Sequence, residues 1–261
     1  MMDFKGKLTD RAFVKDFCVR YSDTDEKNAL SAANLVNILQ TECINHSAAA
    51  GHGLDYFKDT HTGWAVSHWH IWVDSLPKEG DYIHVSTWSK PFRHAQAHRD
   101  ISIEDETGHE LIHASCRWVL MDTESRHPIK TEAIMDDYCF ETALPYSDEK
   151  FRMPSSSEDA DIYDREFTVE RSDMDVNGHT NNASYIKWAV DDIPDDIFMS
   201  HTLKEMIVKY HKECAKGDHV KSECAIEKAD DGRLLIISTQ YDADDPKKML
   251  CITASYWEKE D

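Results

Sequence analysis

A four-residue segment occurs twice in this chain, and its repetition constrains the fold more than any other feature. Ser22-Asp-Thr-Asp25 returns as Ser172-Asp-Met-Asp175, an offset of 150 residues from position 22 to position 172. A repeat at a fixed offset indicates two copies of one structural unit. The 261 residues suffice for two small domains, and the 41% of hydrophobic residues can supply a core for each. The sequence therefore predicts a duplicated architecture.

Each copy is followed by a helical pattern and then by strand-like segments. Apolar residues at helical spacing predict a helix over about Ser31–Ala50 and a shorter one over about Asn182–Asp192. Gly51 and Pro194 supply stop signals just beyond them. The side chains expected to face inward are Leu35, Ile38, Leu39 and Cys43 in the first helix and Tyr185, Trp188 and Ala189 in the second. The predicted strands are Ser67–Leu76, Tyr82–Phe92, His98–Glu104, Glu110–Asp122, Leu203–Cys214, His219–Lys228, Leu234–Tyr241 and Met249–Glu258.

The order of elements is thus one strand, a helix and a meander of four strands, written twice. A bent antiparallel sheet wrapped around a central helix is the hot-dog fold, so the sequence predicts an α+β protein with a tandem, or double, hot-dog architecture. The segment 145–160 is polar and rich in serine and acidic residues, which is typical of a linker. We expect an N-terminal domain over 1–144 and a C-terminal domain over 161–261. A generic α+β protein with a coincidental repeat is the alternative.

The formal net charge of −21 excludes some classes of partner. A surface this acidic repels phosphate backbones and anionic lipids, so we expect neither nucleic-acid nor membrane binding. No stretch approaches the roughly 20 apolar residues that span a bilayer, and the first residues lack a signal-peptide pattern. The seven cysteines are odd in number and form no CxxC pair, which argues against a disulfide framework and a structural zinc site. We expect a soluble, reduced, cytoplasmic protein.

The segment Asp173–Asn182 places acid, amide and imidazole groups directly before the second predicted helix. Asp175, Asn177 and His179 alternate, so their side chains can converge if this backbone is extended. Gly178 permits a substrate carbonyl to approach the main chain closely. The unpaired N–H groups of a helix's first turn can hold a developing oxyanion. The segment is therefore suited to cleavage of an acyl bond.

Helix capping is the alternative explanation for this segment. Asp173, Asn181 and Asn182 are residue types that cap helices, and we favour that role for the two asparagines. Capping does not account for the three alternating side chains, because a cap needs only one such residue.

The second half contains the pattern Asp175-x-Asn177-x-His179-x-Asn181-Asn182-x-x-Tyr185-Ile186-x-Trp188. It also contains Tyr210-His-Lys-Glu213-Cys214. Both patterns resemble segments of the acyl-ACP thioesterases of plants and bacteria. In the first half, Trp72–Asp81 and Val85–Trp88 are similar to that family's strands, so the resemblance covers nearly the whole chain. It implies a double hot-dog fold and hydrolysis of a fatty acyl thioester carried on acyl carrier protein (ACP), in fatty acid biosynthesis.

The resemblance also implies roles for individual residues. The family's catalytic set falls on Asp175, Asn177, His179 and Glu213 of this chain. The family's cysteine falls on Cys214, which we rank as accessory because the adjacent Glu213 disfavours a thiolate. We expect the thioester carbonyl to be polarised by Asn177 and by main-chain N–H groups near Gly178 and His179. Asp175 is then a nucleophile or an orienting group and Glu213 activates water, with a covalent anhydride and direct water attack both open.

The first half lacks these chemical groups. At the offset of 150, Asn177 aligns with Lys27 and His179 aligns with Ala29. When Gly217-Asp218 is aligned with Gly80-Asp81 instead, Glu213 falls on Leu76. We therefore expect one active site, in the C-terminal domain, and a catalytically degenerate N-terminal domain.

The resemblance places the acyl-chain pocket in the N-terminal domain. Its expected walls include Leu35, Leu39, Ile44, Trp64, Val66, Trp69 and Ile71. Each of these side chains fits a plain hydrophobic core equally well, and we rank the core interpretation first.

Other side chains are candidate binding groups. His68 and His70 alternate like metal ligands, but no nearby cysteine or carboxylate completes a set, so we expect packed or surface histidines, no metal and no cofactor. ACP is acidic, and the candidate basic patches are Lys90–Arg99, or Lys204, Lys209, Lys212 and Lys216. The resemblance also makes a homodimer plausible. The alternative functions are an acyl-CoA thioesterase, a hot-dog 3-hydroxyacyl-thioester dehydratase and a non-enzymatic acyl-thioester binding module.

Overall fold

The computed structural model describes residues 5–90, 96–131, 134–138, 140 and 151–260. They form two compact units, the first drawn from 1–30 and 38–150 and the second from 31–37 and 151–261. Residues 145–150 of the expected linker lie outside the described part. The domain limits expected from the sequence therefore stay predictions.

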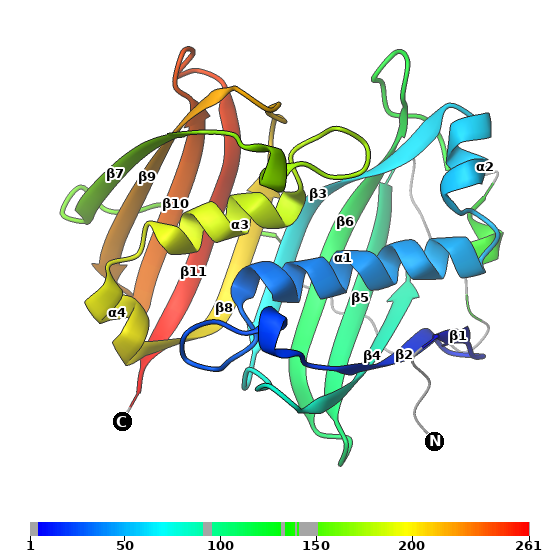
Figure 1. Cartoon of the computed structure of the whole chain (residues 1–261), viewed down its shortest axis with the longest axis horizontal. Coiled ribbons are helices and arrows are strands. Elements are labelled where there is room, and N and C mark those ends of the chain that lie inside the picture. Colours follow the sequence, from blue (N-terminus) through cyan, green and yellow to red (C-terminus); the bar gives the residue numbers. More distant parts are fainter. Residues whose placement is uncertain (1–4, 91–95, 132–133, 139, 141–150, 261) are drawn as a thin grey trace. The chain divides into compact units, whose positions relative to one another are not determined.

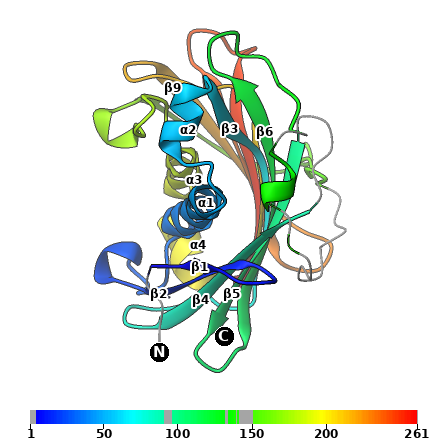
Figure 2. The same cartoon turned by 90° about the vertical axis from the view of Figure 1, so that its right-hand side faces the viewer.

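The first unit contains an antiparallel sheet in the order β1-β2-β4-β5-β6-β3. Figure 2 shows this sheet curving around helix α1, Ala32–Ala49, whose residues from Ile38 onward belong to this unit. A six-residue helix α2, Leu54–Asp59, follows it. The strands are β1 Lys7–Leu8, β2 Phe13–Cys18, β3 Thr62–Val73, β4 Tyr82–Ser89, β5 Gln96–Asp105 and β6 Glu110–Asp122.

The second unit repeats this arrangement. Its antiparallel strands follow the order β8-β11-β10-β9-β7, and helix α3, Asn182–Asp191, lies across one face of them (Figure 1). A short helix α4, Asp195–Ser200, comes next. The strands are β7 Asp161–Thr168, β8 His201–Tyr210, β9 His219–Lys228, β10 Leu234–Asp242 and β11 Met249–Lys259. Each unit thus has one long helix against a bent antiparallel sheet.

Local chemistry fixes both helices. The side chain of Asn181 accepts a hydrogen bond from the N–H of Ala183 at 3.1 Å and caps α3. Just after the C-terminal end of α1, Gly51 adopts a φ of +92°, a left-handed conformation that favours glycine and ends the helix. All the side chains predicted to face inward from the two helices are buried. Burying each leucine or isoleucine stabilises the fold by about 1.5–3 kcal/mol.

The predicted helices and strands are confirmed, and the largest differences lie at the start of β3 and the end of β8. β3 begins at Thr62 and not at the predicted Ser67. A register shift between Val66 and His68 interrupts the alternation of buried side chains, so the sequence pattern does not show the first part of the strand. β3 also ends at Val73, before the predicted Leu76, and β4 ends at Ser89, with residues 91 and 92 of its predicted range outside the described part. β8 ends at Tyr210, before the predicted Cys214, because the N–H groups of the next two residues both turn to one carbonyl, that of Leu250.

The short helices α2 and α4 were not predicted, since six residues give too short a helical period to recognise. No helix in the described part is long and apolar enough to cross a membrane.

Candidate active site

The loop before α3 closes on the carboxylate of Asp175. Its Oδ1 accepts hydrogen bonds from the main-chain N–H groups of Asn177, at 2.8 Å, and His179, at 3.1 Å. The N–H of Asp175 in turn donates to the carbonyl of His179 at 2.8 Å. A bridge between Met174 and Thr180 pairs the two sides of the loop. This carboxylate therefore organises the backbone that carries the amide and the imidazole.

The four predicted catalytic side chains lie as two contacting pairs. The amide Nδ2 of Asn177 donates to Oδ2 of Asp175 at 3.4 Å. Nδ1 of His179 lies 3.4 Å from Oε2 of Glu213, and these two side chains are 50% and 39% exposed. Both members of the second pair are open to water. The structure thus joins Glu213, 34 residues away from His179 in sequence, to the loop before α3.

The segment that carries Glu213 is tied to the start of α3 through Cys214. Thr180 donates its hydroxyl hydrogen bond to the carbonyl of Cys214 at 2.7 Å. The N–H of Cys214 donates to the phenol oxygen of Tyr185 at 3.2 Å, and its Sγ lies 3.2 Å from the same oxygen. No pattern in the sequence indicates these contacts.

Cys214 lacks the surroundings of a nucleophile. Its side chain is buried, and burial raises the pKa of the thiol above its ordinary value, so the thiol stays protonated at neutral pH. Within the described residues, His179 makes no hydrogen bond to this thiol. The accessory ranking from the sequence is therefore favoured over a role as nucleophile.

The expected main-chain oxyanion donors are already engaged. The N–H of Gly178 donates to the carbonyl of Asp175 at 3.1 Å, and the N–H of His179 donates to the Asp175 carboxylate. Both groups serve to close the loop, and the main-chain polarisation of a carbonyl stays a prediction. The side-chain amide of Asn177 donates one hydrogen to Asp175, and its second N–H can serve another acceptor.

Gly178 has a conformational role. Its φ is +77°, and a Cβ built on it would meet nothing within 4 Å, so backbone geometry and not space selects glycine here. The first-half counterpart, Asn28, adopts a φ of +57°.

We expect Gly178→Asn to retain the loop and at least half of the activity, because asparagine tolerates left-handed backbone. Gly178→Val has to adopt the same φ with a branched side chain, so we expect it to destabilise the protein by about 1–2 kcal/mol and to lower activity at least tenfold. Thermal unfolding and steady-state rates measured on both variants check this. Equal behaviour of the two would contradict it.

The first half of the chain forms the same loop but lacks the amide and imidazole side chains. Oδ1 of Asp25 accepts the N–H groups of Lys27 at 3.0 Å and Ala29 at 3.2 Å. A bridge between Thr24 and Leu30 matches the bridge in the second half. The repeat therefore preserved the scaffold of the loop, while the positions equivalent to the amide and the imidazole carry no such groups.

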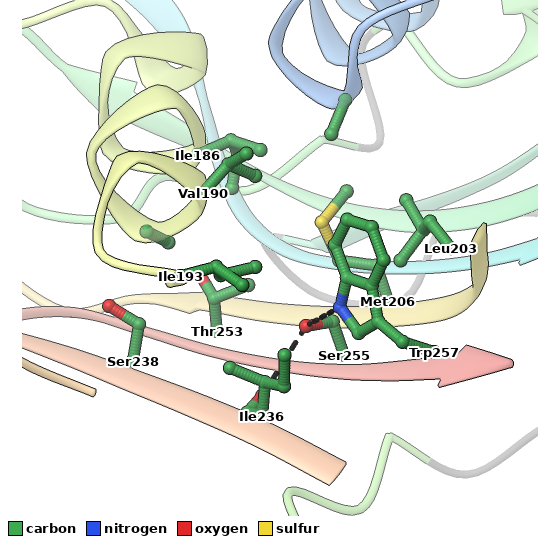
Figure 3. Close-up of a pocket in the computed structure, with 12 residues that line it drawn as sticks. Ile186, Val190, Ile193, Leu203, Met206, Ile236, Ser238, Thr253, Ser255 and Trp257 are labelled. Atoms are coloured by element: carbon green, nitrogen blue, oxygen red, sulfur yellow. Dashed lines mark hydrogen bonds between the residues drawn. The ribbon is translucent and has the colours of Figure 1, made fainter. Parts of the chain in front are cut away.

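The predicted acyl-pocket residues are mostly tightly packed. Trp64 is half-buried, Ile44 is 48% exposed and so lines no interior wall, and the rest are buried. Leu35 belongs to the second unit and the other pocket residues to the first. A small pocket lies in the second unit, bounded by Ile186 of α3 and by Trp257, whose Nε1 donates to Ser255 at 2.8 Å (Figure 3). At about 10 Å³ it can hold at most one water.

The other candidate groups are placed as follows. Ring Nδ1 of His68 contacts the Ser67 hydroxyl at 3.0 Å, and the buried His70 stacks on Trp72. Among the residues that the structure describes, no three histidine, cysteine or acidic side chains are grouped to hold a metal ion.

The basic segment Lys90–Arg99 lies partly outside the described residues, which omit 91–95. Its Arg99 is buried and donates to Nδ1 of His46 at 2.6 Å, while Lys90 lies 3.8 Å from the buried Asp100. Arg99 therefore cannot belong to a surface patch. Lys212 and Lys216 of the second candidate patch are exposed.

Comparison with known proteins places the chain in a family. Residues 10–141 match the acyl-ACP thioesterase N-terminal domain, and residues 156–258 match the acyl-ACP thioesterase C-terminal domain. The chain belongs to the acyl-ACP thioesterase family. A palmitoyl-acyl carrier protein thioesterase of Arabidopsis thaliana is 30% identical over 85% of this chain and 57% of its own length. Oleoyl-acyl carrier protein thioesterase 1 of the same plant is 27% identical over 83% of this chain.

The chain spans 65% of that oleoyl-ACP relative, so it matches about two thirds or less of these relatives' lengths. Among solved structures, a putative oleoyl thioesterase from Lactobacillus plantarum matches 96% of this chain and 97% of its own with a TM-score of 0.84 and 19% identity. The 12:0-ACP thioesterase from Umbellularia californica matches 95% of this chain and 94% of its own with a TM-score of 0.82 and 22% identity. These likenesses confirm the predicted double hot-dog fold.

Proposed function

We propose that this chain hydrolyses the thioester of fatty acyl-ACP to a free fatty acid and ACP. The observation that carries the proposal is the placement of Asp175, Asn177, His179 and Glu213 in one solvent-open site, within a chain that belongs to the acyl-ACP thioesterase family. The names of the plant relatives support ACP as the carrier.

Glu213 acts as the general base. Its carboxylate is 39% exposed, so water can reach it, and it lies beside an imidazole that can hold it in place. Glu213 takes a proton from water, whose oxygen forms a bond to the thioester carbonyl carbon. The C–S bond then breaks, and the departing phosphopantetheine thiolate receives the proton. His179 orients the carboxylate and passes this proton from Glu213 to the thiolate.

Asn177 polarises the thioester carbonyl. Its amide is held by Asp175 through one N–H, which leaves the other to donate to the carbonyl oxygen as negative charge develops there. Asp175 therefore acts as the orienting group. Its Oδ1 already accepts two main-chain N–H groups, and such bonds make a carboxylate a weaker nucleophile.

Two exposed lysines make the surface beside the site suitable for ACP. Lys212 and Lys216 flank Glu213 and Cys214, in a chain whose net charge is −21. Local positive charge is needed there because ACP is acidic, and charges at the rim of an interface act mainly on association.

The test compares a palmitoyl group on ACP and on CoA, measuring released free thiol. We expect a higher kcat/KM with ACP. We also expect the variant with Lys212→Glu and Lys216→Glu to raise KM for acyl-ACP several-fold at unchanged kcat, whereas Lys228→Glu, at the far end of β9, changes neither.

Each other outcome assigns a different function. Equal or better hydrolysis of acyl-CoA would make CoA the carrier. Loss of water from a 3-hydroxyacyl thioester without thiol release would identify a dehydratase. Binding of acyl-ACP without turnover would leave a binding module.

A further inference from the structure

We infer that Tyr185, assisted by Thr180, is a positioning residue that sets the Glu213 carboxylate against His179 by holding both main-chain groups of Cys214. This inference rests on the proposed function and adds two residues to its machinery. Neither side chain contacts the reacting atoms, since both act through the residue after the general base.

The need for such a clamp follows from where β8 ends. The strand stops at Tyr210, three residues before Glu213, so its ladder of hydrogen bonds does not reach the carboxylate. The N–H groups of His211 and Lys212 still bond to the Leu250 carbonyl, at 2.8 and 3.2 Å. Beyond that point the chain leaves the sheet.

The clamp consists of two side chains, Thr180 in the loop before α3 and Tyr185 in the first turn of α3. Thr180 donates to the Cys214 carbonyl at 2.7 Å, and the Tyr185 phenol oxygen accepts the Cys214 N–H at 3.2 Å. All these groups are buried, so no water competes for them. Burial raises the pKa of both the Tyr185 phenol and the Cys214 thiol, which keeps both neutral in the site. One main-chain donor and one main-chain acceptor are thus fixed directly beside Glu213.

The first half of the chain supplies an internal comparison. At the offset of 150, Thr180 aligns with Leu30 and Tyr185 aligns with Leu35, neither of which has a hydroxyl group. With the Gly-Asp turns aligned, Cys214 falls on Pro77, which has no N–H to hold. There the carbonyl of Pro77 is bound by the main-chain N–H of Leu30 at 2.8 Å. The scaffold alone therefore does not require the two hydroxyl groups, and they occur in the half that carries the glutamate.

A displaced general base loses much of its effect, since a shift of about 1 Å can cost about 100-fold in rate. Loss of one clamp contact leaves the other, so we expect smaller effects from single variants. Tyr185→Phe should lower kcat about tenfold, and Thr180→Val about threefold. The double variant should lower kcat by about 30-fold or more, with KM changed less than about twofold in all three.

The controls remove matched hydroxyl groups that do not touch Cys214. Tyr210→Phe deletes the hydroxyl that donates to the Asn182 carbonyl at 3.1 Å, on a ring packed against Tyr185. Thr87→Val deletes an equally buried hydroxyl-to-carbonyl bond, to Asp100 at 3.2 Å. We expect both to keep kcat within about twofold of the parent protein, so that lost stability alone cannot explain the clamp variants.

The deciding measurement repeats Tyr185→Phe in a Glu213→Gln background. If Tyr185 acts through the glutamate, the substitution should there change the residual kcat by less than about twofold. A full tenfold loss in that background, or wild-type kcat in the double clamp variant, would overturn the inference. Absence of thioester hydrolysis by the parent protein would instead remove the proposed function.

Discussion

Replacing Glu213 with glutamine is expected to lower kcat by about 10²- to 10⁴-fold, the range that a general base contributes. Glutamine keeps the size and the polar contacts of the side chain but cannot take a proton from water. The side chain is 39% exposed, so the neutral amide should not disturb packing. We therefore expect unchanged thermal unfolding and a KM within about threefold of the parent value, measured with acyl-ACP at saturating and subsaturating concentrations.

The matched control is Glu205→Gln on strand β8, which precedes Glu213 in the chain. Glu205 also faces a cation, with Oε2 at 3.4 Å from the guanidinium of Arg233, but it has no part in the proposed site. Its substitution should leave kcat within about twofold, because a partly exposed ion pair contributes little to stability. Full activity of Glu213→Gln alongside this control would end the assignment of Glu213 as base.

The fold was largely predictable because the signals are periodic and local. The strands β6, Glu110–Asp122, and β9, His219–Lys228, begin and end where alternation of apolar side chains predicts. The repeated Ser-Asp-x-Asp segment correctly indicated two related units. β3 was misplaced at its start, because a bulge at Ser67 resets the alternation through tertiary pairing with β6, which sequence spacing does not show.

The candidate site was predictable as a set of residues but not as a set of contacts. Types and spacing marked the loop before α3, and resemblance supplied Glu213. The pairing of that carboxylate with His179 depends on how β8 leaves the sheet, which no local pattern encodes. The sequence pattern also does not show that the Gly178 and His179 N–H groups close the loop. A loop's own hydrogen bonds compete with a substrate for each donor, and spacing does not reveal which of them form.

The sequence differences between the two halves indicate more than the location of the active site. It identified Asn177, His179 and Glu213 as specific to the second half. The same alignment also separates Tyr185 from Leu35, a difference that carries meaning only once the phenol is seen to hold Cys214.

Removing the carboxylate of Asp175 is expected to affect both stability and catalysis, and Asp25 separates the two effects. Each carboxylate accepts two main-chain N–H groups in its own half of the chain. Asp175→Ala and Asp25→Ala should therefore each lower the free energy of unfolding by about 1–2 kcal/mol. Only Asp175→Ala should also lower kcat, by about 100-fold or more, since only that loop carries Asn177. Chemical denaturation and steady-state kinetics measure the two effects separately.

Substitution by asparagine then distinguishes the charge of Asp175 from its shape. An amide oxygen still accepts the N–H groups of Asn177 and His179, so Asp175→Asn should retain most of the stability that alanine loses. Without the negative charge, the amide of Asn177 is oriented less strongly. We expect kcat to fall by about 10- to 100-fold, with Asp25→Asn unaffected. If Asp175→Asn kept full activity, Asp175 would serve only to close its loop, as Asp25 does, and neither an orienting charge nor an acyl-aspartate intermediate could be part of the reaction.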